Sequence, residues 1–186
     1  MNWRSVLVAS VMATLGFAVL TGAVAQQPQQ RPAAPAAEQK PLKEAIVGSW
    51  RLLIDDALQA DGTQVPQYGP NPRGILIFGP EGRYSLQIAR DIGRPKFAAN
   101  DRLKGAPEEM KAAFEGMISH FGGYSVSDQD KSLTFRIEAS SYPNWNDTTQ
   151  KRSITALWQD DFTYTNATPS SQTLGGTAVL AWRRIK

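Results

Sequence analysis

The sequence of 186 residues contains no cysteine and a single histidine. Without cysteine the chain can form no disulfide bond, so its folded part depends on its hydrophobic core. One histidine and no cysteine provide too few ligands for a zinc or transition-metal site, and we expect no metal. The sequence also lacks a P-loop, a Rossmann-type glycine pattern and a G-x-S-x-G motif, and we therefore expect no cofactor.

The chain also has no large excess of positive or negative charge. The chain has 20 lysine and arginine residues against 17 aspartate and glutamate residues, a formal net charge of +3. Proteins that bind nucleic acid need basic residues gathered on one surface, commonly with aromatic residues between them. The basic residues here form no such cluster, so we expect no nucleic-acid partner.

The first 25 residues have the pattern of a secretory signal peptide. Arg4 precedes an apolar run over residues 6–20, and the small residues Ala23 and Ala25 stand just before the expected cleavage site. An uncleaved membrane anchor is the alternative, but the run is short for a span of about 20 residues. We therefore expect cleavage after Ala25, no stable membrane span in the mature chain, and a periplasmic or secreted location in a bacterium.

Residues 26–41, QQPQQRPAAPAAEQKP, contain glutamine, proline and alanine but no valine, isoleucine, leucine or aromatic residue. A segment with so few side chains to bury is typical of a disordered tether. The folded domain is then expected over residues 42–186, a length that can bury a core of its own.

Alternation of apolar and polar residues dominates this domain and predicts strands with one buried face. In the first strand Trp50, Leu52 and Ile54 are expected to point inward. The third and fifth expected strands repeat the pattern with Tyr84, Leu86 and Ile88, and with Leu133, Phe135 and Ile137. The other expected strands are Gly74–Phe78, Gly122–Ser127, Thr148–Trp158, Phe162–Thr165 and Thr177–Arg184, which makes eight in all.

One segment has the period of a helix. Met110, Ala113, Phe114 and Met117 recur at i, i+3, i+4 and i+7, and Pro107 suits the first turn. Eight antiparallel strands close most economically into an up-and-down barrel, because closure removes the exposed edges. We therefore predict an all-β barrel with one inserted helix and a modest interior pocket, and a two-sheet sandwich is the second choice.

Six stretches in this order resemble the bacterial and fungal lipocalin-like domain family, which opens with a G-[ST]-W strand. They are IVGSWRLL, YGPNPRGILIF, PEGRYSLQIAR, APEEMKAAFEGMISHFGGY, SYPNWND and TAVLAWRR, and they span residues 46–184. The resemblance implies a lipocalin-like barrel and the binding of a small apolar or amphipathic molecule. The chain departs from secreted lipocalins in having no disulfide and in placing its helix between the third and fourth strands.

The G-[ST]-W opening itself is expected to be structural. In a closed barrel the first and last strands pair, which brings Gly48 and Trp50 beside Trp182 and Arg184. The Arg184 guanidinium can then stack on the Trp50 ring, an arrangement that contributes about 0.5 to 2 kcal/mol. We predict that these residues close one end of the barrel.

Two loops are the candidates for contact with a ligand. The first is the rigid, proline-containing loop from Tyr68 through Arg73. The second is the SYPNWN turn, whose aromatic and amide side chains combine flat surfaces with directional hydrogen bonds. The full set of candidate ligand-binding residues is Tyr68, Arg73, Tyr84, Arg90, His120, Tyr124, Tyr142, Asn144 and Trp145.

Three hypotheses for function remain open. The first is a non-enzymatic barrel that binds or shelters a small, partly apolar molecule. The second is an isomerase or cyclase in which His120, Tyr124 and Tyr84 transfer protons, and the third is a structural or protein-interaction barrel. We assign no catalytic residue, because the adjacent acids Asp55 and Asp56 are expected on opposite faces of a strand.

Overall fold

The computed structural model describes residues 40–167 and 176–186. The predicted signal peptide and all but the last two residues of the predicted tether lie outside the described residues. Within the described part of the chain, no helix is long and apolar enough to cross a membrane.

The described residues form nine antiparallel strands and three short helices, which are joined by turns and loops. The strands are β1 (Gly48–Leu58), β2 (Gln64–Pro66), β3 (Arg73–Phe78), β4 (Arg83–Ala89), β5 (Met117–Ser127), β6 (Ser132–Ser140), β7 (Thr148–Trp158), β8 (Asp161–Asn166) and β9 (Thr177–Arg184). The helices are α1 (Leu42–Ile46), α2 (Pro107–Glu115) and the 3-10 turn η1 (Pro143–Trp145).

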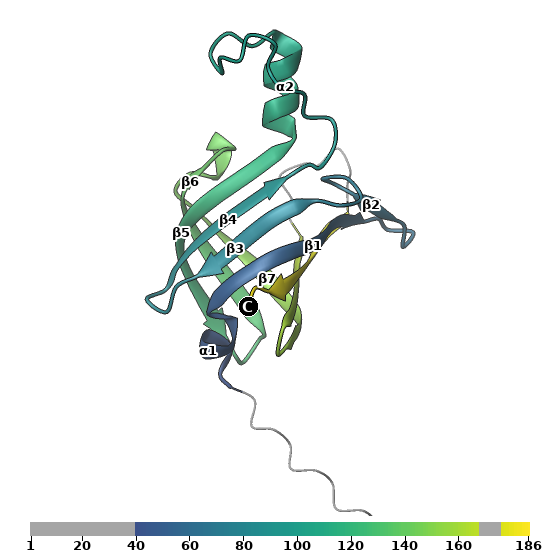
Figure 1. The fold of residues 1–186 in the computed structure, drawn as a ribbon. Helices are drawn as coiled ribbons and strands as arrows, with labels where there is room; N and C mark the ends of the chain where they lie inside the picture. Colours follow the sequence, from purple (N-terminus) through teal and green to yellow (C-terminus); the bar gives the residue numbers. More distant parts are fainter. Residues whose placement is uncertain (1–39, 168–175) are drawn as a thin grey trace, which may run out of the picture. The chain divides into compact units, whose positions relative to one another are not determined.

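Strand pairing closes a barrel, as the alternating pattern predicts. Strand β1 pairs with β3, each strand from β3 to β9 pairs with the next, and β9 pairs back with β1 (Figure 1). The short β2 pairs with the end of β1, from Asp56 to Leu58. The predicted barrel of eight antiparallel strands is confirmed, and β2 is an extra strand.

Several elements differ from the sequence-based prediction in their presence or their bounds. Strand β2 and helix α1 were not predicted, since each is too short to show a periodic pattern. Helix α2 ends at Glu115, and β5 begins at Met117 rather than at Gly122. Pairing of Ala89 with Met117 and of Leu86 with His120 extends β5 in this direction, so Gly122 lies inside the strand.

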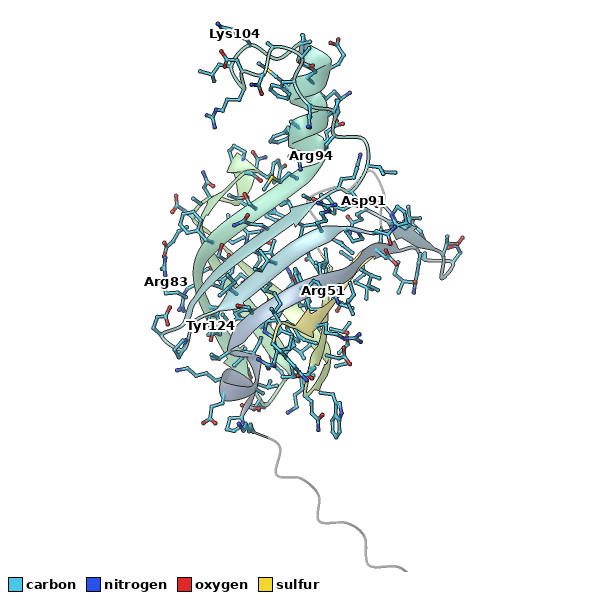
Figure 2. The ribbon with its side chains drawn as sticks, in the orientation of Figure 1. Arg51, Arg83, Asp91, Arg94, Lys104 and Tyr124 are labelled. Carbon is cyan, nitrogen blue, oxygen red and sulfur yellow. The ribbon has the colours of Figure 1, made fainter. Side chains whose placement is uncertain are left out.

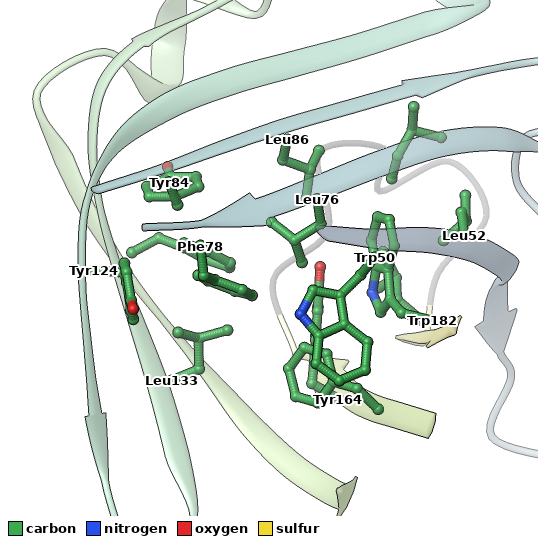
Figure 3. Close-up of a cluster of buried hydrophobic side chains, with 14 of the residues drawn as sticks. Trp50, Leu52, Leu76, Phe78, Tyr84, Leu86, Tyr124, Leu133, Tyr164 and Trp182 are labelled. Carbon is green, nitrogen blue, oxygen red and sulfur yellow. The ribbon is translucent and has the colours of Figure 1, made fainter. Parts of the chain in front are cut away.

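The inward faces of the strands form one aromatic-rich core (Figure 3). On β4 and β6 the predicted alternation is confirmed, and the buried hydrophobic residues there are Tyr84, Leu86, Ile88, Leu133, Phe135 and Ile137. The Phe78 ring packs against Tyr124 with centroids 4.7 Å apart, and the Tyr84 ring lies 4.4 Å from Phe135. These contacts fill the part of the barrel nearer α1.

A bulge in β1 breaks the predicted alternation. The register with β9 shifts between Leu52 and Ile54, so Leu53 has no partner in the ladder. A bulge of one residue reverses which side chains face inward beyond it. The prediction that Ile54 points inward is therefore wrong, because Ile54 is 36% exposed and Asp55 is 4% exposed.

Helix α1 covers one end of the barrel and is fixed there by the first and last strands. The Trp50 Nε1 group donates to the Ile46 carbonyl at 2.8 Å. Arg184 Nη1 and Nη2 donate to the carbonyls of Val47 and Ala45 at 2.7 and 2.6 Å. These bonds satisfy carbonyl groups that the helix end leaves without a partner.

Gly48 makes this arrangement possible. Its φ of +126° is a conformation that other residues rarely adopt, and a Cβ there would lie 2.7 Å from Arg184 Nη1. The Arg184 Cζ atom lies 4.1 Å from the centre of the Trp50 ring. The G-[ST]-W opening therefore makes room for one arginine and supplies the ring on which it stacks.

The segment between β4 and β5 extends away from the barrel and carries α2 (Figure 1). Glu109 fixes the start of the helix by accepting hydrogen bonds from the amides of Ala98 and Ala106, both at 2.8 Å. Figure 2 shows Lys104 at the tip of this excursion and Arg94 near its base. No residue of α2 is buried, so its apolar stripe does not pack into the core.

A glycine in β3 offers a first test of the packing. A Cβ at Gly74 would lie 2.8 Å from the Leu52 Cβ and 3.1 Å from the Gln87 carbonyl oxygen. We expect Gly74→Ala to lower the free energy of unfolding by about 1 to 3 kcal/mol, as overpacking typically does. Gly123→Ala is the matched control, because its nearest neighbour is the flexible Arg136 side chain at 3.3 Å. Equal urea midpoints for the two variants would contradict the close approach of β3 to β1.

Candidate functional site

A cavity of about 40 Å³ lies inside the barrel. Its walls are part apolar and part polar, whereas the barrel end beside α1 is packed with side chains. The apolar and aromatic lining residues are Tyr68, Leu86, Ile88, Ile118, Trp145, Tyr164, Ala178 and Leu180, and the polar ones are Asp55, Gln67, His120, Arg152 and Asn166. One buried water needs roughly 10 to 15 Å³ of such space, so the cavity has room for about three waters.

Asp55 enters the cavity because of the bulge in β1. Gln67, just after β2, donates its side-chain amide to Asp55 Oδ1 at 2.8 Å and its backbone amide to the Asp55 carbonyl at 2.9 Å. Burial, followed by the negative charge of Asp56, raises the pKa of Asp55 to about 7, and the bond from Gln67 opposes this rise. Asp55 is therefore a carboxyl group that changes charge near neutral pH.

His120 points inward from β5 and is neutral. Its Nδ1 atom lies 2.8 Å from the Tyr84 hydroxyl. Burial, and then the positive charge of Arg152, lowers the pKa of His120 to about 3, whereas burial raises the pKa of Tyr84. Tyr84 therefore keeps its proton, and which of the two groups donates depends on the tautomer of the neutral imidazole.

Arg152 brings a positive charge into the same cavity from β7, where it is only 4% exposed. Its Nη1 donates to the Lys151 carbonyl at 3.2 Å, its Nη2 donates to Gln150 Oε1, and its Cζ lies 5.8 Å from the centre of the Phe135 ring. Burial lowers the pKa of Arg152, but an arginine side chain stays charged in proteins.

Aromatic residues of the η1 turn lie where the cavity lining meets the barrel rim. The Trp145 ring lies 5.6 Å from the His120 ring and 5.8 Å from the Tyr142 ring. Thr148 Oγ1 donates to the Trp145 carbonyl at 2.6 Å, and Asn146 Oδ1 accepts from the Ser140 amide at 2.8 Å. The turn is therefore tied to both β6 and β7.

The structure brings together some of the predicted ligand-binding residues. Tyr68, His120 and Trp145 line the cavity. Tyr84 and Tyr142 stand behind them, in contact with His120 and Trp145, and Arg90 donates to the Gln67 carbonyl at 3.2 Å. The remaining three do not line it: Arg73 and Asn144 are exposed, and Tyr124 donates to the Gly79 carbonyl at 2.9 Å.

The proposed proton-transfer trio does not share the cavity. His120 lines it and Tyr84 contacts His120, but Tyr124 bonds to the β3–β4 turn and packs on Phe78 (Figure 3). Among residues 40–167 and 176–186, no group of three or more histidine, aspartate or glutamate side chains is placed to hold a metal ion. The arrangement is suited to hydrogen bonding with a bound molecule.

The sequence analysis did not include five of the lining residues that carry polar groups among its candidates: Asp55, Gln67, Arg152, Tyr164 and Asn166. Arg152 and Ile154 are two residues apart on β7 and therefore face the same side of the sheet. This spacing could have indicated that Arg152 points inward. Asp55 had no such signal, since the bulge that turns it inward is set by the pairing of β1 with β9.

Known proteins similar to this chain were found by sequence and by structure. Residues 47–185 match the sequence model of a family described as a lipocalin-like domain. The 4'-hydroxy-3'-methoxypropiophenone carrier protein ppsC of Aspergillus oryzae is 32% identical over 76 residues, which cover 38% of this chain and 68% of that protein. A solved structure of a redesigned β-barrel is 14% identical with a TM-score of 0.37, over 77% of this chain and 94% of that one.

Proposed function

This chain belongs to the lipocalin-like domain family, and from that premise we propose that it is a carrier that binds a small, partly apolar molecule inside its barrel. The observation that carries the proposal is the convergence of five polar side chains on one cavity with an otherwise apolar wall. Ligand sites typically combine an apolar lining with a few placed polar groups. A barrel that served only as a structural support would have no need of these buried polar groups, whose burial is costly.

The size of the cavity limits how such a ligand sits. Space for about three waters accommodates a polar head group but not a whole aromatic ring. We propose that the head group enters among His120, Arg152 and Asn166, while the apolar body lies against Tyr68 and Trp145. This placement requires the two aromatic side chains to shift when the ligand enters.

The related carrier suggests a suitable first probe. Its name specifies 4'-hydroxy-3'-methoxypropiophenone, a one-ring aromatic ketone with polar groups at both ends. We expect this compound to bind with a Kd of roughly 1 to 100 μM, as is typical of a small ligand with limited burial. Isothermal titration calorimetry and quenching of tryptophan fluorescence measure the binding, and native mass spectrometry of the purified protein detects any ligand that it retains.

A pair of variants on β9 separates binding inside the barrel from binding to its surface. Ala178 lines the cavity, whereas Ala181 lies on the opposite face of the same strand. We expect Ala178→Leu to weaken binding at least ten-fold because it fills the cavity, and Ala181→Leu to leave binding within two-fold. Equal affinities for both variants would place the ligand elsewhere. No binding of the ketone or of a panel of one-ring aromatic compounds, with no retained ligand, would exclude the carrier.

A further inference from the structure

The charge of Arg152 is not neutralised by the part of the protein that the structure describes. Each ion pair among those residues involves other side chains, and none includes Arg152. The two acceptors of its hydrogen bonds, the Lys151 carbonyl and Gln150 Oε1, are both neutral. A buried charge without a charged partner is strongly unfavourable, so its presence in a cavity wall calls for an explanation.

The groups that interact most closely with Arg152 are neutral. Tyr164 and Tyr84 are the ionisable groups that would stabilise the Arg152 charge if they lost their protons. Burial raises the pKa of both hydroxyls, so they stay protonated and uncharged. His120 is neutral and shares a hydrogen bond with the Tyr84 hydroxyl. Asp55 also lines the cavity, but its hydrogen bond is to Gln67 and it makes no ion pair with Arg152.

We infer that the cavity selects ligands with an anionic oxygen group, such as a carboxylate, and that Arg152 is the residue that recognises this group. The inference rests on the proposed carrier function and names the class of its ligand. A guanidinium presents a planar array of N–H donors that matches the two oxygens of a carboxylate. The anion would restore charge balance inside the barrel, and the neighbouring donors would hydrogen-bond to it.

The aromatic rim indicates the body of the same ligand. Tyr68 and Trp145 line the cavity, and the Tyr142 ring contacts Trp145. A flat, apolar body fits against such rings, whereas the cavity behind them has room only for the head group. The ligand class is therefore a small organic acid with one aromatic ring or a body of similar shape.

Benzoate and benzamide form a matched pair of probes, because they share one ring and nearly one shape but differ in charge at neutral pH. We expect the full chain to bind benzoate at least ten-fold more tightly than benzamide by isothermal titration calorimetry at low salt. Arg152→Gln should reduce this preference to less than two-fold, and Arg152→Lys should keep part of it. Arg136→Gln is the control, because Arg136 is an exposed residue of neighbouring β6.

The outcomes separate the inference from the function on which it rests. Benzamide binding as tightly as benzoate, or a benzoate preference that survives Arg152→Gln, would overturn the role of Arg152 and leave the carrier intact. Failure of benzoate, benzamide and the aromatic ketone alike would overturn both. If Arg152→Gln does not fold by circular dichroism, Arg152→Lys takes its place, and an undiminished benzoate preference in that variant would overturn the role of Arg152.

Discussion

Replacing Trp50 by alanine is expected to lower the free energy of unfolding by about 3 to 5 kcal/mol, the range for loss of a buried tryptophan. The Trp50 side chain is fully buried, and its ring packs against Phe162 with centroids 5.4 Å apart. The substitution also removes the stacking partner of Arg184 and the donor to the Ile46 carbonyl. Helix α1 would thereby lose part of what fixes it to the barrel end.

Urea denaturation of Trp50→Ala and Trp158→Ala measures this effect against a matched control. Trp158 is 62% exposed at the end of β7, so its replacement should change the free energy of unfolding by less than about 0.5 kcal/mol. Thermal unfolding should show a shift of roughly 10 to 15 °C for Trp50→Ala. Similar losses in both variants would mean that closure of the barrel does not depend on the Trp50 ring.

The second large effect is a pH dependence of stability with two opposing parts. The pKa of Asp55 rises from 3.8 in the unfolded chain to about 7 in the fold. Between these values the folded state binds a proton that the unfolded state has lost, so stability falls as pH rises. Over the whole window this loss amounts to roughly 4 kcal/mol.

His120 acts in the opposite direction. Its pKa falls from 6.5 in the unfolded chain to about 3 in the fold. Between these values the unfolded state binds a proton that the folded state does not, so stability rises with pH by a similar amount. From pH 3.8 to 6.5 the two slopes oppose each other, and the unaltered protein should show little net dependence from these groups.

Single substitutions should reveal each slope. We expect Asp55→Asn, which can still accept the bond from Gln67, to raise the free energy of unfolding at pH 8 by roughly 4 kcal/mol. Its stability should increase from pH 4 to 6.5, whereas that of His120→Gln should decrease over the same interval. Urea unfolding at intervals of one pH unit measures both, with the exposed Asp147→Asn as control. Parallel profiles for all four proteins would show that neither group is buried as described.

Much of the fold follows from the sequence because each strand carries its own pattern. On β4 and β6 the alternation of single residues identifies the buried hydrophobic side chains correctly. The helix period over Met110 and Phe114 likewise identifies α2, although the structure leaves both side chains partly exposed because the helix lies outside the barrel. The residue pattern within one segment thus predicts reliably whether it forms a strand or a helix. It predicts less reliably what that strand or helix packs against.

The polar half of the cavity was harder to predict, for a specific physical reason. Alternation along β1 assigns Ile54 to the interior, but pairing with β9 inserts a bulge and turns Asp55 inward instead. The sequence of one strand does not contain the register of its partner. Arg152 was not predicted to line the cavity for a different reason. Charged residues ordinarily lie in contact with water, and a buried arginine is an exception to this preference.

The covered end of the barrel has a consequence for how fast a ligand would exchange. With α1 fixed over one end by Trp50 and Arg184, a molecule in the cavity would exchange through the opposite end, on the side of Tyr68 and Trp145. A substitution at this end that changed only the barrier to passage would multiply the association and dissociation rate constants by the same factor and leave the affinity unchanged. The rate of ligand exchange and the affinity could thus be adjusted separately. The residues at the open end of the barrel would set the rate constants, and the groups inside the cavity would set the dissociation constant.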